Sequence, residues 1–343
     1  RLYDEAAAVL SALHAASVKP DARIRSTIAS VCTRGEYLLF LFRLAAVESD
    51  FEKEVKEALE SRGVPQCVLP HMTMEQFLYF MYVSTLVMTA SLYYIVHQKS
   101  AGAFDMPEPE EFAGSVTRLL EHGYAGLSAL EVAERERLNA ACAPDDGLQP
   151  ESRFFSAIAD LVREYGLPGV TVDRIAEKLH RAKSSLYSYS KNKHELIATT
   201  IREELDLFSA FLCEKMRAAK TFSEGVYVML GAAVRYLCAR RNLGAVLAWL
   251  SLFNAQKTET ELESRLAELF LPLVNGVSVL PQYSWVRLSV LPRFLLGLAS
   301  GLVTRGGRLG FSADELTAQV PVLYECIRLG PAGAGLQYID SGL

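Results

Sequence analysis

The chain lacks the residue patterns of the common metal sites, disulfide frameworks and catalytic centres. Its six cysteines are scattered without a CxxC pair, and its six histidines do not have the spacing of metal ligands. Such cysteines indicate reduced thiols in a cytoplasmic protein rather than a disulfide framework or a zinc site. There is also no phosphate loop, HExxH motif, nucleophile elbow or pair of carboxylates in an apolar setting. We therefore expect a cytoplasmic protein that is not an enzyme and that needs no cofactor or metal.

The absence of strand patterns and the net charge restrict the fold class and the way in which the chain could bind DNA. No stretch alternates between apolar and polar residues for long enough to predict a sheet. The net charge is −5, so any contact with DNA must come from a local basic patch rather than from the molecule as a whole. With 343 residues, half of them hydrophobic, the chain has room for two to three domains and extensive helix–helix burial. We expect an all-α fold.

One apolar run is long enough to cross a membrane. The 20 residues from Phe77 to Val96 carry no charge, and a helix that spans a bilayer needs about 20 apolar residues. The run nevertheless contains two serines, two threonines and four tyrosines, which is a high polar content for a helix that faces lipid. A lone membrane anchor is the alternative, but we expect a helix buried at a helical interface and no membrane partner.

The segments before and after the centre of the chain share landmarks that indicate an internal repeat. The tetrapeptide LESR at residues 59–62 recurs at residues 262–265, an offset of 203. The acidic start of a predicted helix at residues 110–112 has a counterpart at residues 314–316, an offset of 204. Because two separate landmarks give nearly the same offset, the two flanking segments are predicted to be copies of one helical domain.

This repeat has consequences for the assembly. The apolar run at residues 77–96 falls on a second apolar run at residues 280–299, and we expect both to lie in a shared helical interface. Arg1 falls on Glu204, just after the central segment. The repeat therefore predicts that a copy of the central segment ended upstream of Arg1.

The central segment, residues 151–197, predicts a compact unit of short helices. Its first helix has apolar residues along one face, and Gly166 is placed to end it as a C-cap. Thr171 is a helix N-cap, because its hydroxyl can satisfy a free backbone N–H at the start of the second helix. The second helix is expected to face inward with its apolar residues Val172, Ile175, Ala176 and Leu179.

The second half of the unit completes a helix-turn-helix pattern. A tight connection through His180 and Arg181 leads to a third helix at residues 182–188, and a long fourth helix begins at Asn192. Residues 171–193 contain six Lys or Arg against two acidic residues, a local net charge of +4. A solvated basic face on a helical hairpin would have the same charge, so the charge alone does not establish DNA binding.

The landmarks of this unit resemble the DNA-binding domain of TetR-family transcriptional regulators over about 47 residues. They fall in order across three helices: Gly166, Thr171-Val172, Ile175-Ala176-Glu177, Lys183-Ser184-Ser185-Leu186-Tyr187, Lys193 and Leu196. The resemblance implies that Thr171 and Lys193 bind phosphate and that the third helix enters the major groove. With the basic and hydroxyl side chains next to these positions, the expected DNA-binding residues are Thr171, Arg181, Lys183, Ser184, Ser185, Tyr187, Ser188, Tyr189 and Lys193.

The resemblance also implies the organisation of the chain. We expect a first TetR-like helical sensor at residues 1–141, a linker at 142–150, the DNA-binding domain at 151–200, and a second sensor at 201–343. In this family a dimer places two recognition helices in successive major grooves roughly 34 Å apart, and a ligand in the sensor releases the DNA. Here the two sensors are expected to pair within one chain as a pseudo-dimer, with a homodimer as the alternative.

The expected function is a repressor that binds a double-stranded DNA operator and is controlled by an unknown small-molecule effector. Aromatic residues of the sensors could line its pocket, although most are expected to be core: Phe40, Phe42, Phe80, Tyr82, Trp249, Phe253, Tyr283 and Trp285. The sequence departs from the family at His180 and Arg181, which replace Gly and an apolar residue in the turn, and at Ser190, which replaces an aromatic residue. These departures favour the alternative, a helical sensing or protein-interaction scaffold with a vestigial DNA-binding head.

Overall fold

The computed structural model describes residues 20–33, 61, 73–99, 107–124, 126–144, 150–182, 193–253, 261–274 and 290–336. Within these ranges every regular element is a helix, which confirms the all-α class. The α-helices, with one 3₁₀ turn, are α2 (Pro20–Thr33), α5 (Met74–Lys99), α6 (Pro109–His122), α7 (Val132–Ala141), α8 (Arg153–Gly169), α9 (Val172–Lys178), α11 (Lys193–Met216), α12 (Phe222–Ala239), α13 (Arg241–Phe253), α14 (Glu261–Glu268), η2 (Leu271–Leu273), α15 (Val290–Arg308), α16 (Ala313–Thr317) and α17 (Val320–Gly333).

Local sequence determines where several of these helices begin. Thr221 accepts a hydrogen bond from the backbone N–H of Glu224, and this N-cap begins α12. Ser312 begins α16 with a capping box, in which the Glu315 carboxylate accepts a hydrogen bond from the Ser312 backbone N–H. Pro109 begins α6 at a position where a missing N–H costs nothing. The two landmarks at residues 110–112 and 314–316 therefore both lie in the first turn of a helix.

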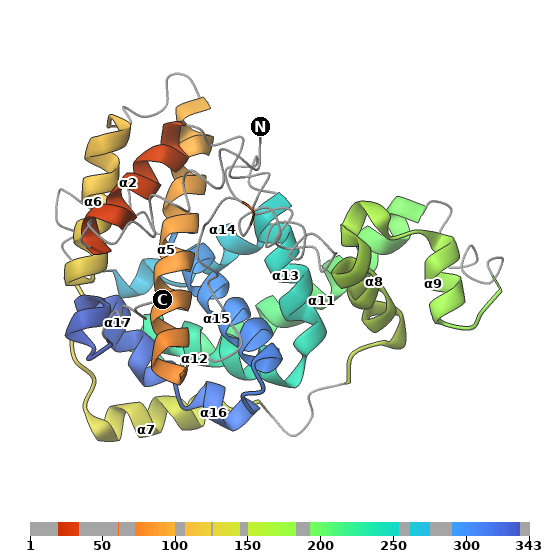
Figure 1. The fold of residues 1–343 in the computed structure, drawn as a ribbon. Coiled ribbons are helices and arrows are strands. Elements are labelled where there is room, and N and C mark those ends of the chain that lie inside the picture. The colour runs from red at the N-terminus through yellow and green to blue at the C-terminus, as the bar shows by residue number, and fades with distance from the viewer. Residues whose placement is uncertain are drawn as a thin grey trace.

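The long apolar helix α5 is packed inside the protein rather than left exposed. By length and composition, its span from Met74 to Ile95 could cross a membrane, but 67% of this window is buried. Its main neighbour is α15, and Figure 1 shows α5 lying next to it. Small residues let the two helices approach closely, since Gly297, Gly301 and Gly306 face Thr85, Met81 and Phe77. Along this contact the residue numbers rise in α15 while those of their partners fall in α5, so the two helices are antiparallel. The part of the second apolar run that the structure describes, residues 290–299, thus packs against the first run, and residues 280–289 lie outside the described residues.

A second contact joins the segment before the central unit (residues 1–141, the first half) to the segment after it (residues 201–343, the second half), and this contact is reciprocal. A Cβ on Gly123 would clash with the backbone of Arg328 and Leu329, and a Cβ on Gly330 would clash with the backbone of Leu120 and Glu121. If Gly123 is matched with Gly330, an offset of 207, Arg328 is matched with Glu121, so the contact of Gly123 with Arg328 has its counterpart in the contact of Gly330 with Glu121. Reciprocity of this kind is what a two-fold relation between equivalent surfaces produces. Both glycines have positive φ, +66° and +78°. The absence of a side chain therefore permits the left-handed backbone conformation as well as the close contact.

The helix that ends the first half crosses over to the second half. Arg137 on α7 forms an ion pair with the buried carboxylate of Glu224 on α12 at 2.5 Å. The Tyr227 hydroxyl donates a hydrogen bond to Asn139 at 3.1 Å. Cys142 is fully buried, and its thiol approaches the carbonyl oxygen of Val228. The expected linker at residues 142–150 therefore begins with a residue that is part of the core.

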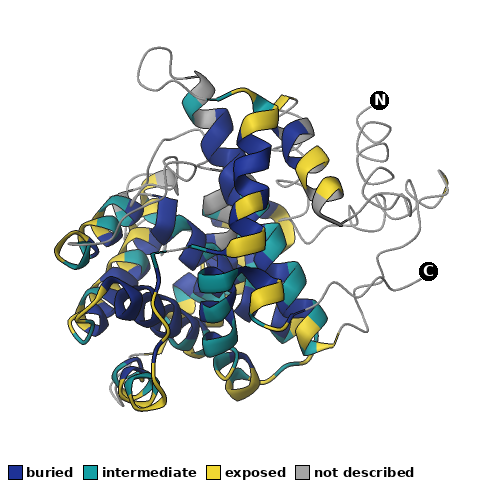
Figure 2. Ribbon diagram, turned by 90° about the vertical axis from the view of Figure 1, so that its left-hand side faces the viewer, coloured by how far each residue is buried: buried dark blue, intermediate teal, exposed yellow. Residues whose placement is uncertain are grey.

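The described helices of the two halves pack together into what we call the body of the protein. The helices of the central unit lie at one side of this body (Figure 1). Figure 1 shows α8 and α9 extending away from α2, α5 and α6. Helix α8 contacts α13 and α11 of the body as well as α9. Figure 2 shows that burial is concentrated along the central helices, with exposed residues on the outer faces. The central unit is thus connected to the body through packed helices.

Candidate nucleic-acid interface and internal cavity

The first part of the expected DNA-binding unit has the predicted local structure. Regular helix geometry in α8 is interrupted at Gly166, where φ is +67° and ψ is 164°. The Thr171 hydroxyl oxygen accepts a hydrogen bond from the backbone N–H of Arg174 and caps α9. Val172, Ile175 and Ala176 are buried, whereas Leu179 is only partly buried. The predicted C-cap, N-cap and inward face of the second helix are therefore confirmed.

The turn after α9 places His180 in a backbone conformation that favours glycine. His180 has a φ of +51°, the left-handed conformation that favours glycine. The backbone N–H of His180 donates to the carbonyl of Glu177, and that of Arg181 donates to the carbonyl of Ala176. These two hydrogen bonds form a Schellman motif, which normally places Gly at the left-handed position. His180 therefore adopts the backbone of a tight turn at a cost of roughly 1–2 kcal/mol.

The cations of this region differ in their surroundings. The Arg174 guanidinium lies 3.8 Å from the centre of the Tyr165 ring and donates to the carbonyl of Gly169 at 2.7 Å. Lys178 forms an ion pair with Asp160 at 3.1 Å. Arg181 is exposed, and no ion pair joins it to another described residue. Among the described cations of this turn, Arg181 is therefore the one best placed to contact a phosphate.

Most of the expected DNA-binding residues lie outside the described residues. These are Lys183, Ser184, Ser185, Tyr187, Ser188 and Tyr189, together with the side chain of Lys193, whose backbone begins α11. The described structure places Thr171 and Arg181 at opposite ends of α9. The Thr171 oxygen is occupied as an acceptor by the cap, and its hydroxyl hydrogen can still be donated to a phosphate.

A polar cluster joins α8 to the body. Arg163 donates hydrogen bonds to Asp160 at 2.7 Å and to the side-chain oxygen of Asn242 on α13. The Asn242 amide in turn donates to Oε2 of Glu151 at 2.6 Å. The other oxygen of Glu151, Oε1, is buried and accepts no hydrogen bond from any described residue. Hydrogen bonds therefore join α8 to α13 in addition to the packing of the two helices.

A buried ion pair lies beside this cluster. Arg240, the C-cap residue of α12, donates to the carboxylate of Glu204 on α11, and both side chains are less than a tenth exposed. Burial raises the pKa of Glu204, Arg240 opposes this rise, and the nearby Glu151 adds to it. Breaking a buried pair costs more than its formation gains, because the remaining charge is left without compensation. The pair therefore fixes the end of α12 against α11.

Comparison with protein-family models gives no match, and comparison with curated proteins gives none either. Within the described ranges, no three His, Cys, Asp or Glu side chains converge as they would around a metal ion.

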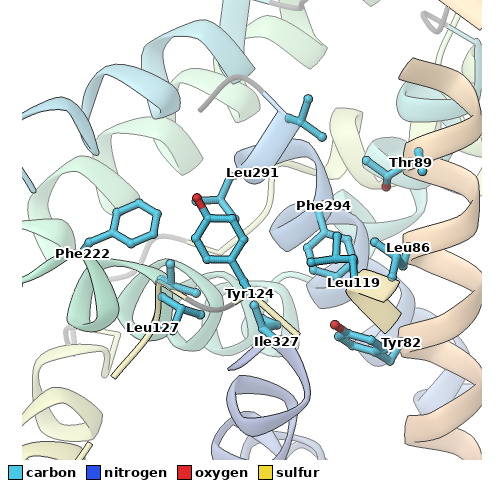
Figure 3. Close-up of a pocket in the computed structure, with 13 residues that line it drawn as sticks. Tyr82, Leu86, Thr89, Leu119, Tyr124, Leu127, Phe222, Leu291, Phe294 and Ile327 are labelled. Carbon is cyan, nitrogen blue, oxygen red and sulfur yellow. The ribbon is translucent and has the colours of Figure 1, made fainter. Parts of the chain in front are cut away.

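The body contains an apolar cavity with a volume of about 40 Å³. Helices α5 and α6 of the first half and α12, α15 and α17 of the second half all contribute to its wall. Figure 3 shows side chains from these different elements projecting towards one space. Its lining residues are Tyr82, Leu86, Thr89, Ala90, Leu119, Tyr124, Leu127, Phe222, Val226, Val290, Leu291, Phe294 and Ile327.

The cavity lining combines apolar walls with a few hydroxyl groups. No hydrogen bond joins the hydroxyl of Tyr124 or Thr89 to another described side chain or backbone group, although both residues line the cavity. Burial raises the pKa of Tyr124, so its hydroxyl stays protonated at neutral pH. Of the aromatics that the sequence indicated, only Tyr82 is among the described lining residues. Tyr124 and Phe222 were missed, because they come from opposite halves and helical spacing cannot show that they converge.

Proposed function

We propose that the chain is a DNA-binding transcriptional regulator whose head, residues 151–200, is carried by a pair of helical sensor domains. The observation that carries this proposal is the arrangement from α8 to the turn after α9, with a capped second helix and a Schellman turn at His180. That arrangement directs the chain into the basic segment that follows, as a helix-turn-helix requires. The local net charge of +4 at residues 171–193 supports the same role.

The two sensors are proposed to act as a pseudo-dimer within one chain. The antiparallel contact between α5 and α15 supports this, as do the reciprocal contacts of Gly123 with Arg328 and of Gly330 with Glu121. The head is attached at α13 and α11, so movements of the second sensor reach it through Asn242 and Arg163. Ligand control of DNA binding is proposed to use this connection.

The first test is selection of duplexes that the full chain binds from a random pool of DNA. Recovery of one short motif, or of two half-sites about one helical turn apart, is expected for a sequence-specific regulator. The number of half-sites also distinguishes one head per assembly from two. Recovery of nothing above background would contradict the proposal.

A pair of variants makes the test specific to the head. Lys183→Ala and Tyr187→Ala, both on the expected recognition helix, should each abolish selection of the motif. Lys220→Ala is the matched control, because it removes the same charge from an exposed position between α11 and α12 of the body. About four phosphate contacts also predict a slope of about −3.6 for the logarithm of the affinity against the logarithm of the salt concentration.

A second function, a sensing or interaction scaffold with a vestigial head, is favoured by particular observations. His180 strains the turn, and both Arg174 and Lys178 are engaged within the protein rather than directed towards a ligand. If this function holds, no duplex should be selected above background, and Lys183→Ala should leave this result unchanged. The salt slope predicted above should then be absent, because the head makes no phosphate contacts.

A further inference from the structure

We propose that the cavity between the two halves binds one small, uncharged and mostly apolar molecule with a single hydrogen-bonding group, and that this molecule is the effector. The binding of such a molecule is independent of the proposed function, whereas its regulatory effect rests on it. An apolar pocket with a few convergent polar groups is the usual form of a small-molecule site. The shared wall further implies one ligand for each chain, not one for each half.

The chemistry of the wall selects against charge. None of the lining residues is ionised at neutral pH. A carboxylate or an ammonium group placed there would lose its hydration without gaining a counter-charge, which is very unfavourable. The hydroxyls of Tyr124 and Thr89 offer instead one or two hydrogen bonds to a hydroxyl or carbonyl oxygen. The site therefore favours a neutral alcohol, phenol or ketone with an apolar body.

The size of the cavity makes binding a conformational event. A single water molecule needs about 10–15 Å³ of such space, so the cavity has room for roughly three. A ligand with one aromatic ring must therefore displace part of the wall. The wall includes the first turns of α15, through Val290, Leu291 and Phe294.

Displacement of α15 has a route to the head. Helix α15 packs along α13, and α13 packs against α8. Asn242 at the start of α13 accepts a hydrogen bond from Arg163 of α8. A ligand that binds more tightly to the expanded cavity shifts the population towards the displaced position of α15. The head would then move relative to the body without any direct contact with the ligand.

The experiment uses p-cresol as the probe, since it is neutral and has one ring and one hydroxyl. Its matched control is 4-methylbenzoate, which has the same body but a negative charge. Calorimetric titration of the full chain, without DNA, should show saturable binding of p-cresol with one site per chain. The carboxylate should bind at least about tenfold more weakly. Equal affinity for the two compounds would overturn the proposal, and so would two equivalent sites.

Two variants locate the site and keep the test independent of any one substitution. Ala90→Leu fills the cavity and should weaken p-cresol binding at least about tenfold, whereas Ala133→Leu, the same change on an exposed face of α7, should not. Leu119→Ala enlarges the cavity and should bind the two-ring probe 2-naphthol at least about tenfold more tightly than the wild-type chain does. Circular dichroism and a cooperative melt establish that each variant is folded. If Ala90→Leu does not fold, Leu119→Ala decides alone. Unchanged binding in the folded variants would overturn the assignment.

The regulatory effect is tested separately, with DNA. Addition of p-cresol should change the affinity of the wild-type chain for its selected duplex, and Ala90→Leu should lose that response. If p-cresol binds to the cavity but no duplex is selected, the ligand site stands and the DNA-binding proposal fails. If a duplex is selected but p-cresol does not bind, the ligand site fails and the DNA-binding proposal stands.

Discussion

Replacement of Gly330 by alanine tests the contact between the two halves most directly. Its φ of +78° and ψ of 161° lie in a region that is almost exclusive to glycine, and this costs another residue about 1–3 kcal/mol. A Cβ would also lie 2.7 Å from the carbonyl oxygen of Glu121 and closer still to that of Leu120. Because these are backbone atoms of α6, they cannot rotate away as a side chain would. Moving a packed backbone costs about a further 1–3 kcal/mol.

The expected loss for Gly330→Ala is therefore about 2–6 kcal/mol in the free energy of unfolding. Urea denaturation followed by circular dichroism measures it. The control is Gly335→Ala, since Gly335 also has positive φ, +83°, but a Cβ there would meet no atom within 4 Å. The control should lose only about 1–2 kcal/mol. The difference between the two variants isolates the cost of separating α17 from α6.

The reciprocal position gives a check on the same reasoning. Gly123→Ala should be about as destabilising as Gly330→Ala, because its Cβ would meet the backbone of Arg328 and Leu329. The double variant should lose less than the two single losses together, since one separation of the helices relieves both clashes. Equal losses for Gly330→Ala and Gly335→Ala would refute the packed interface, and full additivity would refute its reciprocity.

Three further predictions concern single positions. His180→Gly should stabilise the chain by about 0.5–1 kcal/mol, since it removes left-handed strain at some cost in chain entropy; a lower urea midpoint would contradict this. Gly301→Ala should stay within about 1 kcal/mol of the wild type, because a Cβ there meets only the flexible end of Met81 and alanine favours the helix; a loss as large as that of Gly330→Ala would contradict it. Burial raises the pKa of Tyr324 from 10.0 to about 12, so its neutral hydroxyl contributes stability below pH 10 that is lost as the pH rises through 12. The wild type should lose about 2 kcal/mol more than Tyr324→Phe between pH 10 and pH 12 in urea titrations, and parallel pH profiles would contradict this.

Much of the head could be predicted from local sequence. Gly166 breaks α8, Thr171 caps α9, and the turn follows at His180, each because the backbone at that point needs a particular residue type. The helical class and the burial of the run at residues 77–96 also followed from composition and pattern. These properties depend on residues close together in the chain, and such short-range requirements are visible in a sequence.

The contacts between distant segments needed the tertiary structure. The sequence determined which segments form helices, where the caps of the head lie, and that two apolar runs require a buried place. Only the fold decided that the ends of α6 and α17 meet at their glycines, that Cys142 belongs to the core, and that Tyr124 and Phe222 line one cavity. The physical reason is that caps and periodicity act over one or two helical turns. A shared cavity depends on how helices far apart in the chain cross, and that follows from the packing of all their side chains together.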